Sequence, residues 1–238
     1  MNRVALFRPD DGRAESASAL LRDLGAEPLP DPMLAVEPTG EAPRADAAIT
    51  VLTSKTGAEL VAEADWRPGG ELVAIGAPTA EALEALGYTV NRLPSEFSSS
   101  GLVAELATDA PGTPIEVARS DHGSDVLTDG LNDAGAYVHE TVLYRLVRPG
   151  EAGESTVAAA NGDLAAACFT SSLTVEHFLA AADERGVRGA AIDGLNGAVV
   201  GAIGEPTRET AETLGIDVDV VPQTAQFDAL AEAVVDRL

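Results

Sequence analysis

The stretch "VAIGAPTAEALEALG" (residues 73–87) returns near the end of the chain as "GAIGEPTRETAETLG" (residues 201–215). The glycines, the Pro-Thr pair and the leucine keep the same spacing in both copies. Each copy has the pattern of a short apolar strand, a Gly-x-Pro-Thr turn and an amphipathic helix that ends at glycine. A strand–turn–helix unit that occurs twice predicts an internal repeat of α/β type.

The repeat extends over nearly the whole chain. Three further pairs of segments match in the same order: VALFRPDDG (4–12) with IEVARSDHG (115–123), LTSKTG (52–57) with FTSSLT (169–174), and LPSEFSSSGL (93–102) with VPQTAQFDAL (221–230). We interpret this as a gene duplication that produced two similar α/β lobes, with a ligand site expected in the cleft between them. The repeat alone leaves open whether the chain crosses between the lobes once or twice.

Buried strands and amphipathic helices alternate along the chain, which is typical of α/β proteins with parallel sheets. The predicted strands are 4–7, 48–52, 72–75, 115–118, 167–169 and 198–203. The clearest predicted helices are 15–25, 79–87, 123–135 and 172–186, each ending at a glycine that favours a C-terminal cap.

The charge balance is strongly acidic, with a net charge of −24 from 39 acids against fourteen arginines and the single lysine Lys55. Such a surface repels nucleic acid and anionic membranes, so we expect neither as a partner. The acids serve either a cationic ligand or adaptation to high salt. Their spread over all predicted helices and the near loss of lysine favour a halophilic protein.

Several kinds of chemistry find no support in the sequence. Cys168 is alone in an apolar run, which indicates an inert core thiol and excludes a disulfide or thiolate metal site. The three histidines do not cluster, and GAIGEPT lacks the GxGxxG order of a dinucleotide site. We therefore expect no metal and no cofactor. The opening MNRVALFRPDDGR is too short and too charged for a signal peptide, which predicts a cytoplasmic protein.

The two Gly-x-Pro-Thr turns are the first candidate binding elements. Gly76 and Gly204 let the backbone turn, and Thr79 and Thr207 either cap the following helix or bond to a ligand. Free N–H groups at such a helix start attract anions without a basic side chain. The occurrence of the pair at the same place in both halves favours contact with a ligand.

Hydroxyl-rich loops supply a second set of candidates. Thr53, Ser54 and Lys55 follow one predicted strand, and Ser171 and Ser172 follow its repeat equivalent. These positions lie at the carboxyl edge of the sheet, where open α/β proteins bind ligands. The hydroxyls are either helix caps or binding groups, and Lys55 is either a binding cation or a solvated side chain.

Two arginines occupy equivalent strand ends. Arg8 and Arg119 each precede an Asp-x-Gly turn. Each guanidinium either holds a ligand carboxylate with two parallel hydrogen bonds or pairs with one of the many acids nearby.

Taken together, these segments resemble those of the uroporphyrinogen-III synthase family. The resemblance rests on the ordered set VALFRP, ITVLTS, VAIGAPTA, LPSEFSSSGL, ETVLYRL, ACFTSS and GAIGEPT, which covers almost the full length. One departure is Ser124, which stands where many relatives carry a basic residue after the equivalent of Arg119.

The resemblance implies a specific architecture. It consists of two Rossmann-like or flavodoxin-like lobes, one from residues 1–35 and 149–238 and the other from 36–148. Two antiparallel extended strands, near 26–43 and 136–150, would join the lobes and permit domain motion.

The resemblance also implies a reaction that needs little acid–base machinery. Hydroxymethylbilane would lose water and close to uroporphyrinogen III with ring D reversed, while the enzyme folds the linear tetrapyrrole. Tyr144 matches the family tyrosine that assists the departing hydroxyl, although it is also suited to packing between the strands. We expect a monomer whose partner is this small molecule. The alternatives are a non-catalytic tetrapyrrole- or polyanion-binding protein of the same fold, a periplasmic binder, and a nucleotide-sugar transferase.

Overall fold

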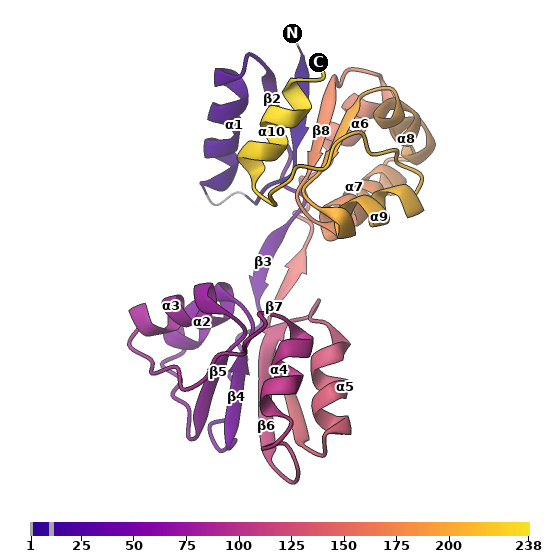
Figure 1. Ribbon diagram of the computed structural model, residues 1–238. Coiled ribbons are helices and arrows are strands. Elements are labelled where there is room, and N and C mark those ends of the chain that lie inside the picture. The colour runs from indigo at the N-terminus through magenta and orange to yellow at the C-terminus, as the bar shows by residue number, and fades with distance from the viewer. Residues whose placement is uncertain (1, 10–11) are drawn as a thin grey trace. The chain divides into compact units, whose positions relative to one another are not determined.

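A computed structural model describes residues 2–9 and 12–238 (Figure 1). The chain forms two compact units, unit 1 from residues 1–35 and 147–238 and unit 2 from residues 36–146. Each unit is an α/β layer structure whose sheet is mainly parallel, which confirms the predicted fold class. The chain therefore passes from unit 1 into unit 2 and back again.

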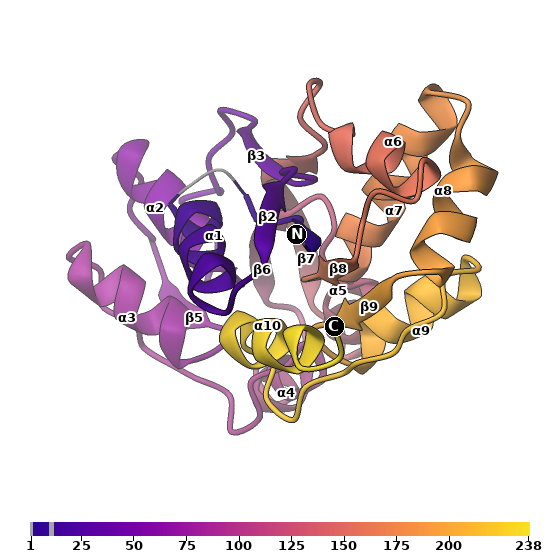
Figure 2. The same cartoon turned by 90° about the horizontal axis from the view of Figure 1, so that it is seen from above.

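Unit 1 is built on a four-stranded sheet with the order β2-β1-β8-β9, in which all neighbours are parallel. The strands are β1 (Arg3–Leu6), β2 (Glu27–Pro30), β8 (Ala166–Phe169) and β9 (Val199–Ala202). The helices are α1 (Arg13–Asp23), α6 (Glu154–Ala160), α7 (Ser172–Glu184), α8 (Arg188–Asn196), α9 (Glu205–Thr213) and α10 (Phe227–Val235). Helices α1 and α10 cover one face of the sheet, and α6 to α9 cover the other (Figure 2).

Unit 2 is built on a five-stranded sheet with the order β3-β7-β6-β4-β5. The strands are β3 (Ala35–Pro38), β4 (Ile49–Leu52), β5 (Glu71–Ala74), β6 (Pro114–Ser120) and β7 (Tyr137–Val147). The helices are α2 (Lys55–Glu63), α3 (Ala77–Ala85), α4 (Ser99–Leu106) and α5 (Asp125–Asp133). Helices α2 and α3 pack on one face of this sheet, and α4 and α5 pack on the other (Figure 1).

The strand orders of the two units are equivalent. Strands β2-β1-β8-β9 of unit 1 correspond to β7-β6-β4-β5 of unit 2, and a parallel bridge extends each row at Val220 or Arg92. We count β1 as strand 1 of unit 1 and β6 as strand 1 of unit 2, and the bridge as strand 5 of each. Both sheets then follow the order 2-1-3-4-5 that is typical of flavodoxin-like folds. The sequence repeat therefore corresponds to a repeat of structure.

Each sequence repeat is shared between the units. The first repeat contributes β1 and β2 to unit 1, and β4, β5 and the bridge at Arg92 to unit 2. The second repeat contributes β6 and β7 to unit 2, and β8, β9 and the bridge at Val220 to unit 1. The proline-rich segment after α1 begins as the sheet strand β2, and residues 137–144 of β7 are paired with β6. Parts of the two segments expected as connectors are thus strands of the sheets, and the chain passes between the units within these segments, at residues 35/36 and 146/147.

Candidate functional site

Several predicted residues of unit 2 lie together at the carboxyl edge of its sheet. Leu52 of β4 pairs with Ala74 of the neighbouring strand β5, so Ser54 and Gly76 each lie two residues beyond a matched pair. Strand β6 pairs with β4 on the side away from β5, and its carboxyl end lies where the order of the strands in the sheet reverses. In open α/β sheets this edge and this reversal mark the place where ligands bind.

Ser54 and Tyr144 are in direct contact at this edge. The Ser54 hydroxyl oxygen accepts a hydrogen bond from the Tyr144 hydroxyl (3.0 Å) and another from the Gly57 amide (2.9 Å). The second bond makes Ser54 the N-cap of α2. The ring of Tyr144 packs with Leu143 and other core side chains, and the residue is only 6% exposed. The contact therefore holds the phenol hydroxyl of Tyr144 in a fixed position.

The neighbours of Ser54 differ in how far they reach the surface. Thr53 is half-buried between the end of β4 and Ser54. Lys55 is the first residue of α2 and is exposed to solvent, so its ammonium group is available at the same edge.

The two Gly-x-Pro-Thr turns have the same geometry. Gly76 (φ −173°, ψ 173°) and Gly204 (φ −171°, ψ 172°) are the N-caps of α3 and α9, both in extended conformation. The Thr79 amide donates to the Gly76 carbonyl at 3.1 Å, and the Thr207 amide donates to the Gly204 carbonyl at the same distance. Both threonine side chains are buried.

This geometry limits the amides that each helix start can offer. The residue before each threonine is a proline, which has no N–H, and the threonine amide already has an acceptor. The first helical residue, Ala77 in α3 and Glu205 in α9, carries the amide that remains for an anion. Each turn therefore has one amide at its helix start that suits an anion. Anion binding there, like ligand contact by the threonine hydroxyls, stays a prediction.

The equivalent loops of unit 1 are also adjacent. Ser171 caps α7 in a reciprocal capping box with Thr174. The Ser172 hydroxyl donates to the Pro206 carbonyl (3.0 Å) and accepts from the Thr210 hydroxyl (2.9 Å), which joins the start of α7 to the start of α9. The structure thus brings Ser171 and Ser172 close to the Gly204–Thr207 turn.

Arg8 lies at the carboxyl end of β1, beside the loop that carries Ser171. The residue before it, Phe7, stacks on Phe169 with ring centroids 4.5 Å apart, which fixes the two strand ends side by side. The Arg8 guanidinium lies over the ring of Phe227, 5.1 Å from its centroid. Substrate binding by Arg8 stays a prediction.

Arg119 is engaged within unit 2. Its guanidinium donates to Glu140 (2.6 Å) and to the Ser124 carbonyl (2.5 Å), and only 3% of the residue is exposed. A Cβ at position 123 would lie 2.3 Å from the Arg119 Cδ, so Gly123 is needed for the side chain to pass beneath its loop. The third nitrogen of Arg119, Nη2, lies 3.9 Å from Asp125, so all three nitrogens already have partners within unit 2, and substrate binding by Arg119 stays a prediction.

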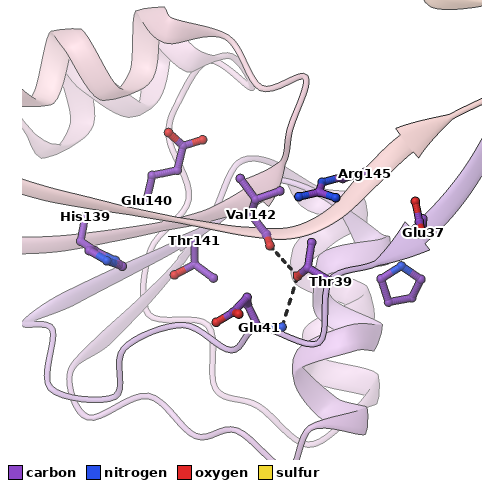
Figure 3. Close-up of a pocket in the computed structure, with 9 residues that line it drawn as sticks. Glu37, Thr39, Glu41, His139, Glu140, Thr141, Val142 and Arg145 are labelled. Carbon is purple, nitrogen blue, oxygen red and sulfur yellow. Dashed lines mark hydrogen bonds between the residues drawn. The ribbon is translucent and has the colours of Figure 1, made fainter.

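A pocket of about 580 Å³ lies elsewhere in unit 2, between β7 and the end of β3 with the segment that follows it (Figure 3). Three glutamates, Glu37, Glu41 and Glu140, line it together with Arg145, and the Thr39 hydroxyl closes one side by donating to the Val142 carbonyl. None of the predicted binding residues lines this pocket. Its acidic lining does not suit a polycarboxylate ligand.

The sequence analysis missed Phe97, which lies against Gly76 at the carboxyl edge of unit 2. It is 60% exposed, although it is one of the largest apolar side chains in the chain. Alignment of LPSEFSSSGL with VPQTAQFDAL places it opposite Ala225, and this difference between the repeats is the sequence signal that could have identified it.

The sequence of the chain matches that of a known protein family. A family model described as "Uroporphyrinogen-III synthase HemD" matches residues 15–232. The chain belongs to the uroporphyrinogen-III synthase family. A uroporphyrinogen-III synthase of Synechococcus elongatus is 27% identical, with 94% of this chain and 90% of that protein covered.

Solved structures show the same fold. A mutant uroporphyrinogen-III synthase from Thermus thermophilus superposes with a TM-score of 0.69 at 21% identity, covering 98% of this chain and 96% of that one. The enzyme from Helicobacter pylori gives a TM-score of 0.67 at 13% identity, with both chains fully covered.

Membership in the family makes the chain an enzyme, a cyclising lyase of tetrapyrrole biosynthesis that acts on a small molecule. Within residues 2–9 and 12–238, no helix is both long and apolar enough to cross a membrane. In the same residues, no three histidine, cysteine or acidic side chains gather as a metal site would require.

Proposed function

We propose that this chain converts hydroxymethylbilane to uroporphyrinogen III, with loss of water and inversion of ring D. The observation that carries the proposal is the match of the family model over residues 15–232, which includes Tyr144 and both Gly-x-Pro-Thr turns. The contact between Tyr144 and Ser54 at the sheet edge supports it independently.

The substrate supplies most of the chemical driving force. Electron release from a pyrrole nitrogen expels the hydroxyl group, and the resulting cation is attacked by the substituted α-carbon of ring D. The spiro intermediate then fragments and recloses at the other α-carbon, which reverses ring D before the last proton leaves. Because the free substrate closes to the symmetric isomer I, the enzyme acts chiefly by holding the chain in the conformation that leads to isomer III.

Tyr144 is the residue that we assign to the departing hydroxyl. Its phenol donates a proton as the carbon–oxygen bond breaks, so that water rather than hydroxide leaves. Ser54 holds the phenol in place before the substrate binds. This role is assistance rather than an absolute requirement, since the pyrrole nitrogen already drives the expulsion.

The substrate carboxylates are proposed to bind at the carboxyl edge of the sheet in each unit. In unit 2 the donors are the amide at the start of α3, the hydroxyls of Thr53 and Ser54, and Lys55. In unit 1 they are the amide at the start of α9, the Ser171 hydroxyl and Arg8. Ser172 is proposed to support them, since its own proton is donated to the Pro206 carbonyl and joins the two helix starts. Amides suit a polyanion in an acidic protein because they attract carboxylates through dipoles, without requiring a basic surface.

We also propose that the enzyme acts as a cytoplasmic monomer. The duplicated unit within one chain supplies both halves of the structure, which supports the monomer. The single thiol suits a reducing compartment. Light scattering after gel filtration tests the first point, and cell fractionation tests the second.

The function is tested by supplying enzymatically made hydroxymethylbilane and separating the product isomers by chromatography after oxidation. The expected result is isomer III, with isomer I reduced to the amount that escapes the enzyme. Isomer I alone, at the rate seen without protein, would overturn the proposal. Binding of the substrate without turnover would indicate the non-catalytic alternative.

A further inference from the structure

We propose that Phe97 is a pyrrole-binding residue whose exposed ring stacks on one ring of the tetrapyrrole substrate. The inference rests on the proposed function for the nature of the ligand. Its structural basis is the placement of one large apolar side chain at the edge of unit 2 that also carries Ser54 and Tyr144.

The ring is seated on the bare backbone of Gly76. A Cβ added at Gly76 would lie 3.1 Å from the Phe97 Cγ and 3.2 Å from the Phe97 Cβ. The backbone of Gly76 is extended and would accept any residue, so the packing of Phe97 is what favours glycine here. An added methyl group would move the ring by a few tenths of an ångström.

A tight turn holds the backbone on either side of Phe97 in the sequence. The Ser98 hydroxyl caps α4 by accepting from the Gly101 amide (3.0 Å) and donates to Glu96 (2.8 Å). A Cβ at Gly101 would lie 2.0 Å from the Glu96 carbonyl oxygen, so this turn too depends on glycine. The backbone that carries the ring is therefore held in a turn rather than on a loose loop, which reduces the entropy lost on binding.

Helix capping accounts for only part of this arrangement. Phe97 precedes the N-cap of α4, a position where an apolar residue often packs on the fourth residue of the helix, here Leu102. Leu102 is completely buried, yet 60% of Phe97 remains in solvent. Most of the ring surface is thus free for another partner.

The location of the ring identifies that partner. Phe97 lies against the start of α3, and Ser54 occupies the matching position at the end of the adjacent strand. A linear tetrapyrrole offers flat, electron-rich rings flanked by carboxylates. The amide and Ser54 suit the carboxylates, while the exposed aromatic face suits the pyrrole itself.

Unit 1 lacks this feature, which makes the proposed contact specific to one half. The equivalent loop of unit 1 has Ala225 at this position, and its exposed residues Gln223, Thr224 and Gln226 are polar. The aromatic of that loop, Phe227, is buried beneath Arg8. Phe97 therefore distinguishes the two otherwise similar edges.

The test compares Phe97→Ala, Phe97→Leu and Phe97→Tyr with the wild-type enzyme. Loss of one stacking contact is expected to raise KM about 3- to 10-fold in Phe97→Ala, with kcat within about 2-fold. Phe97→Leu should recover part of the loss and Phe97→Tyr nearly all of it. Fluorescence titration with uroporphyrin III, a tetrapyrrole that cannot react, should show the same order of affinities.

Tyr137→Ala is the matched control. Tyr137 is the other strongly exposed aromatic of unit 2, at 70%, but it begins β7 and so lies at the amino edge of the parallel sheet. This variant should leave KM and uroporphyrin affinity unchanged. Thermal unfolding should be nearly the same in all variants, because neither ring is buried.

Gly76→Ala provides a second, independent test. The added methyl group should shift the ring slightly and raise KM by less than Phe97→Ala does, and the double variant should be no worse than Phe97→Ala. An unchanged KM and uroporphyrin affinity in Phe97→Ala, with the wild type making isomer III, would overturn this inference alone. A wild type that makes only isomer I would instead overturn the proposed function.

Discussion

Ser54 and Tyr144 lie 90 residues apart in the chain and meet through one hydrogen bond. Ser54 accepts from both the phenol and an amide, so its own hydroxyl proton is free to point outward to a ligand. One small side chain thereby caps a helix and supports the phenol, and it keeps a proton for the proposed bond to a substrate carboxylate. The sequence left open whether Ser54 is a helix cap or a binding group, and the structure makes the two roles compatible.

Tyr144→Phe removes the phenol oxygen and keeps the buried ring. We expect kcat to fall about 10- to 100-fold, near the lower range for loss of an acid, because the substrate provides the main push. The free energy of unfolding should fall by only about 1 kcal/mol, the contribution of one hydrogen bond. Isomer-resolved kinetics and urea unfolding measure the two effects.

Ser54→Ala separates positioning from catalysis. It leaves the phenol in place without its acceptor, so kcat should fall less than in Tyr144→Phe, and stability should fall by about 1 kcal/mol through the lost cap. Ser124→Ala, which removes the N-cap of α5 in the same unit, controls for the cap. If the kcat values of Ser124→Ala and Ser54→Ala were equal, Ser54 would have no role beyond capping.

Cys168 illustrates a residue whose character could be predicted from its neighbours. It is completely buried, and burial raises the pKa of its thiol to about 12. Since the thiol stays protonated at any pH well below that value, the native protein should not react with a disulfide reagent at pH 8. One equivalent should react after denaturation in guanidinium, and rapid labelling of the native protein would contradict the prediction.

The partners of Arg119 could not be predicted in the same way. The sequence shows many acids nearby, but Glu140 is selected by the pairing of β6 with β7, which places it opposite Val117, two residues before Arg119. The register of such a pairing has no local sequence signal. Residue types at strand ends are therefore readable from the sequence, whereas the pairs they form depend on register.

At the scale of the element, strands were the most predictable feature. Each of the six predicted strands is found, with its ends displaced by at most two residues, because continuous apolar runs mark strands buried on both faces. Helices α6 and α8 have no counterpart in unit 2, so the repeat could not reveal them. They approach closely, since a Cβ at Gly194 would lie 1.8 Å from the Ala159 carbonyl oxygen.

The start of α6 depends on a buried aspartate from a distant segment. The Asp31 carboxylate accepts from the Gly153 amide (2.8 Å) and the Ser155 amide (2.8 Å), and also from the Ser155 hydroxyl. It ties the chain leaving β2 to the chain that returns from β7, both within unit 1. The carboxylate thus replaces the side-chain cap that α6 lacks.

Asp31→Ala should therefore lower the free energy of unfolding by about 3 kcal/mol, because it leaves buried donors without an acceptor. Asp31→Asn, which keeps one acceptor oxygen, should cost roughly half as much. Asp23→Ala, at an exposed aspartate of α1, should change stability by less than about 0.5 kcal/mol. Equal urea midpoints for Asp31→Ala and Asp23→Ala would refute the assigned role.

At the scale of the whole molecule, the repeat alone could not predict which strands of each repeat pack into which unit. The two repeats keep the same order in the sequence, yet each contributes two strands to one unit and three to the other. Sequence similarity records the order of the segments but not which segments pack together. The family resemblance, rather than the repeat, implied the discontinuous lobes.

The net charge of −24 affects how the whole enzyme attracts or repels a charged substrate. The substrate of the family carries carboxylates on every pyrrole ring, so protein and substrate repel each other at long range. Salt shortens the screening length from about 10 Å at 0.1 M to about 3 Å at 1 M, which weakens this repulsion more than it weakens contacts at the site. Amide donors held in place by α3 and α9 retain their orientation in salt.

Activity should therefore rise with ionic strength. We expect kcat/KM to increase several-fold between 0.05 M and 1 M KCl, mainly through a lower KM, since screening acts on encounter rather than on bond breaking. Steady-state assays across this range, with circular dichroism at each point to show that the protein remains folded, measure the effect. Sucrose at matched osmolality is the control, and it should leave KM unchanged because it does not screen charge. If activity were highest in dilute buffer, attraction to cationic side chains such as Lys55 and Arg8 would dominate substrate binding, and the proposed role of the backbone amides would be wrong.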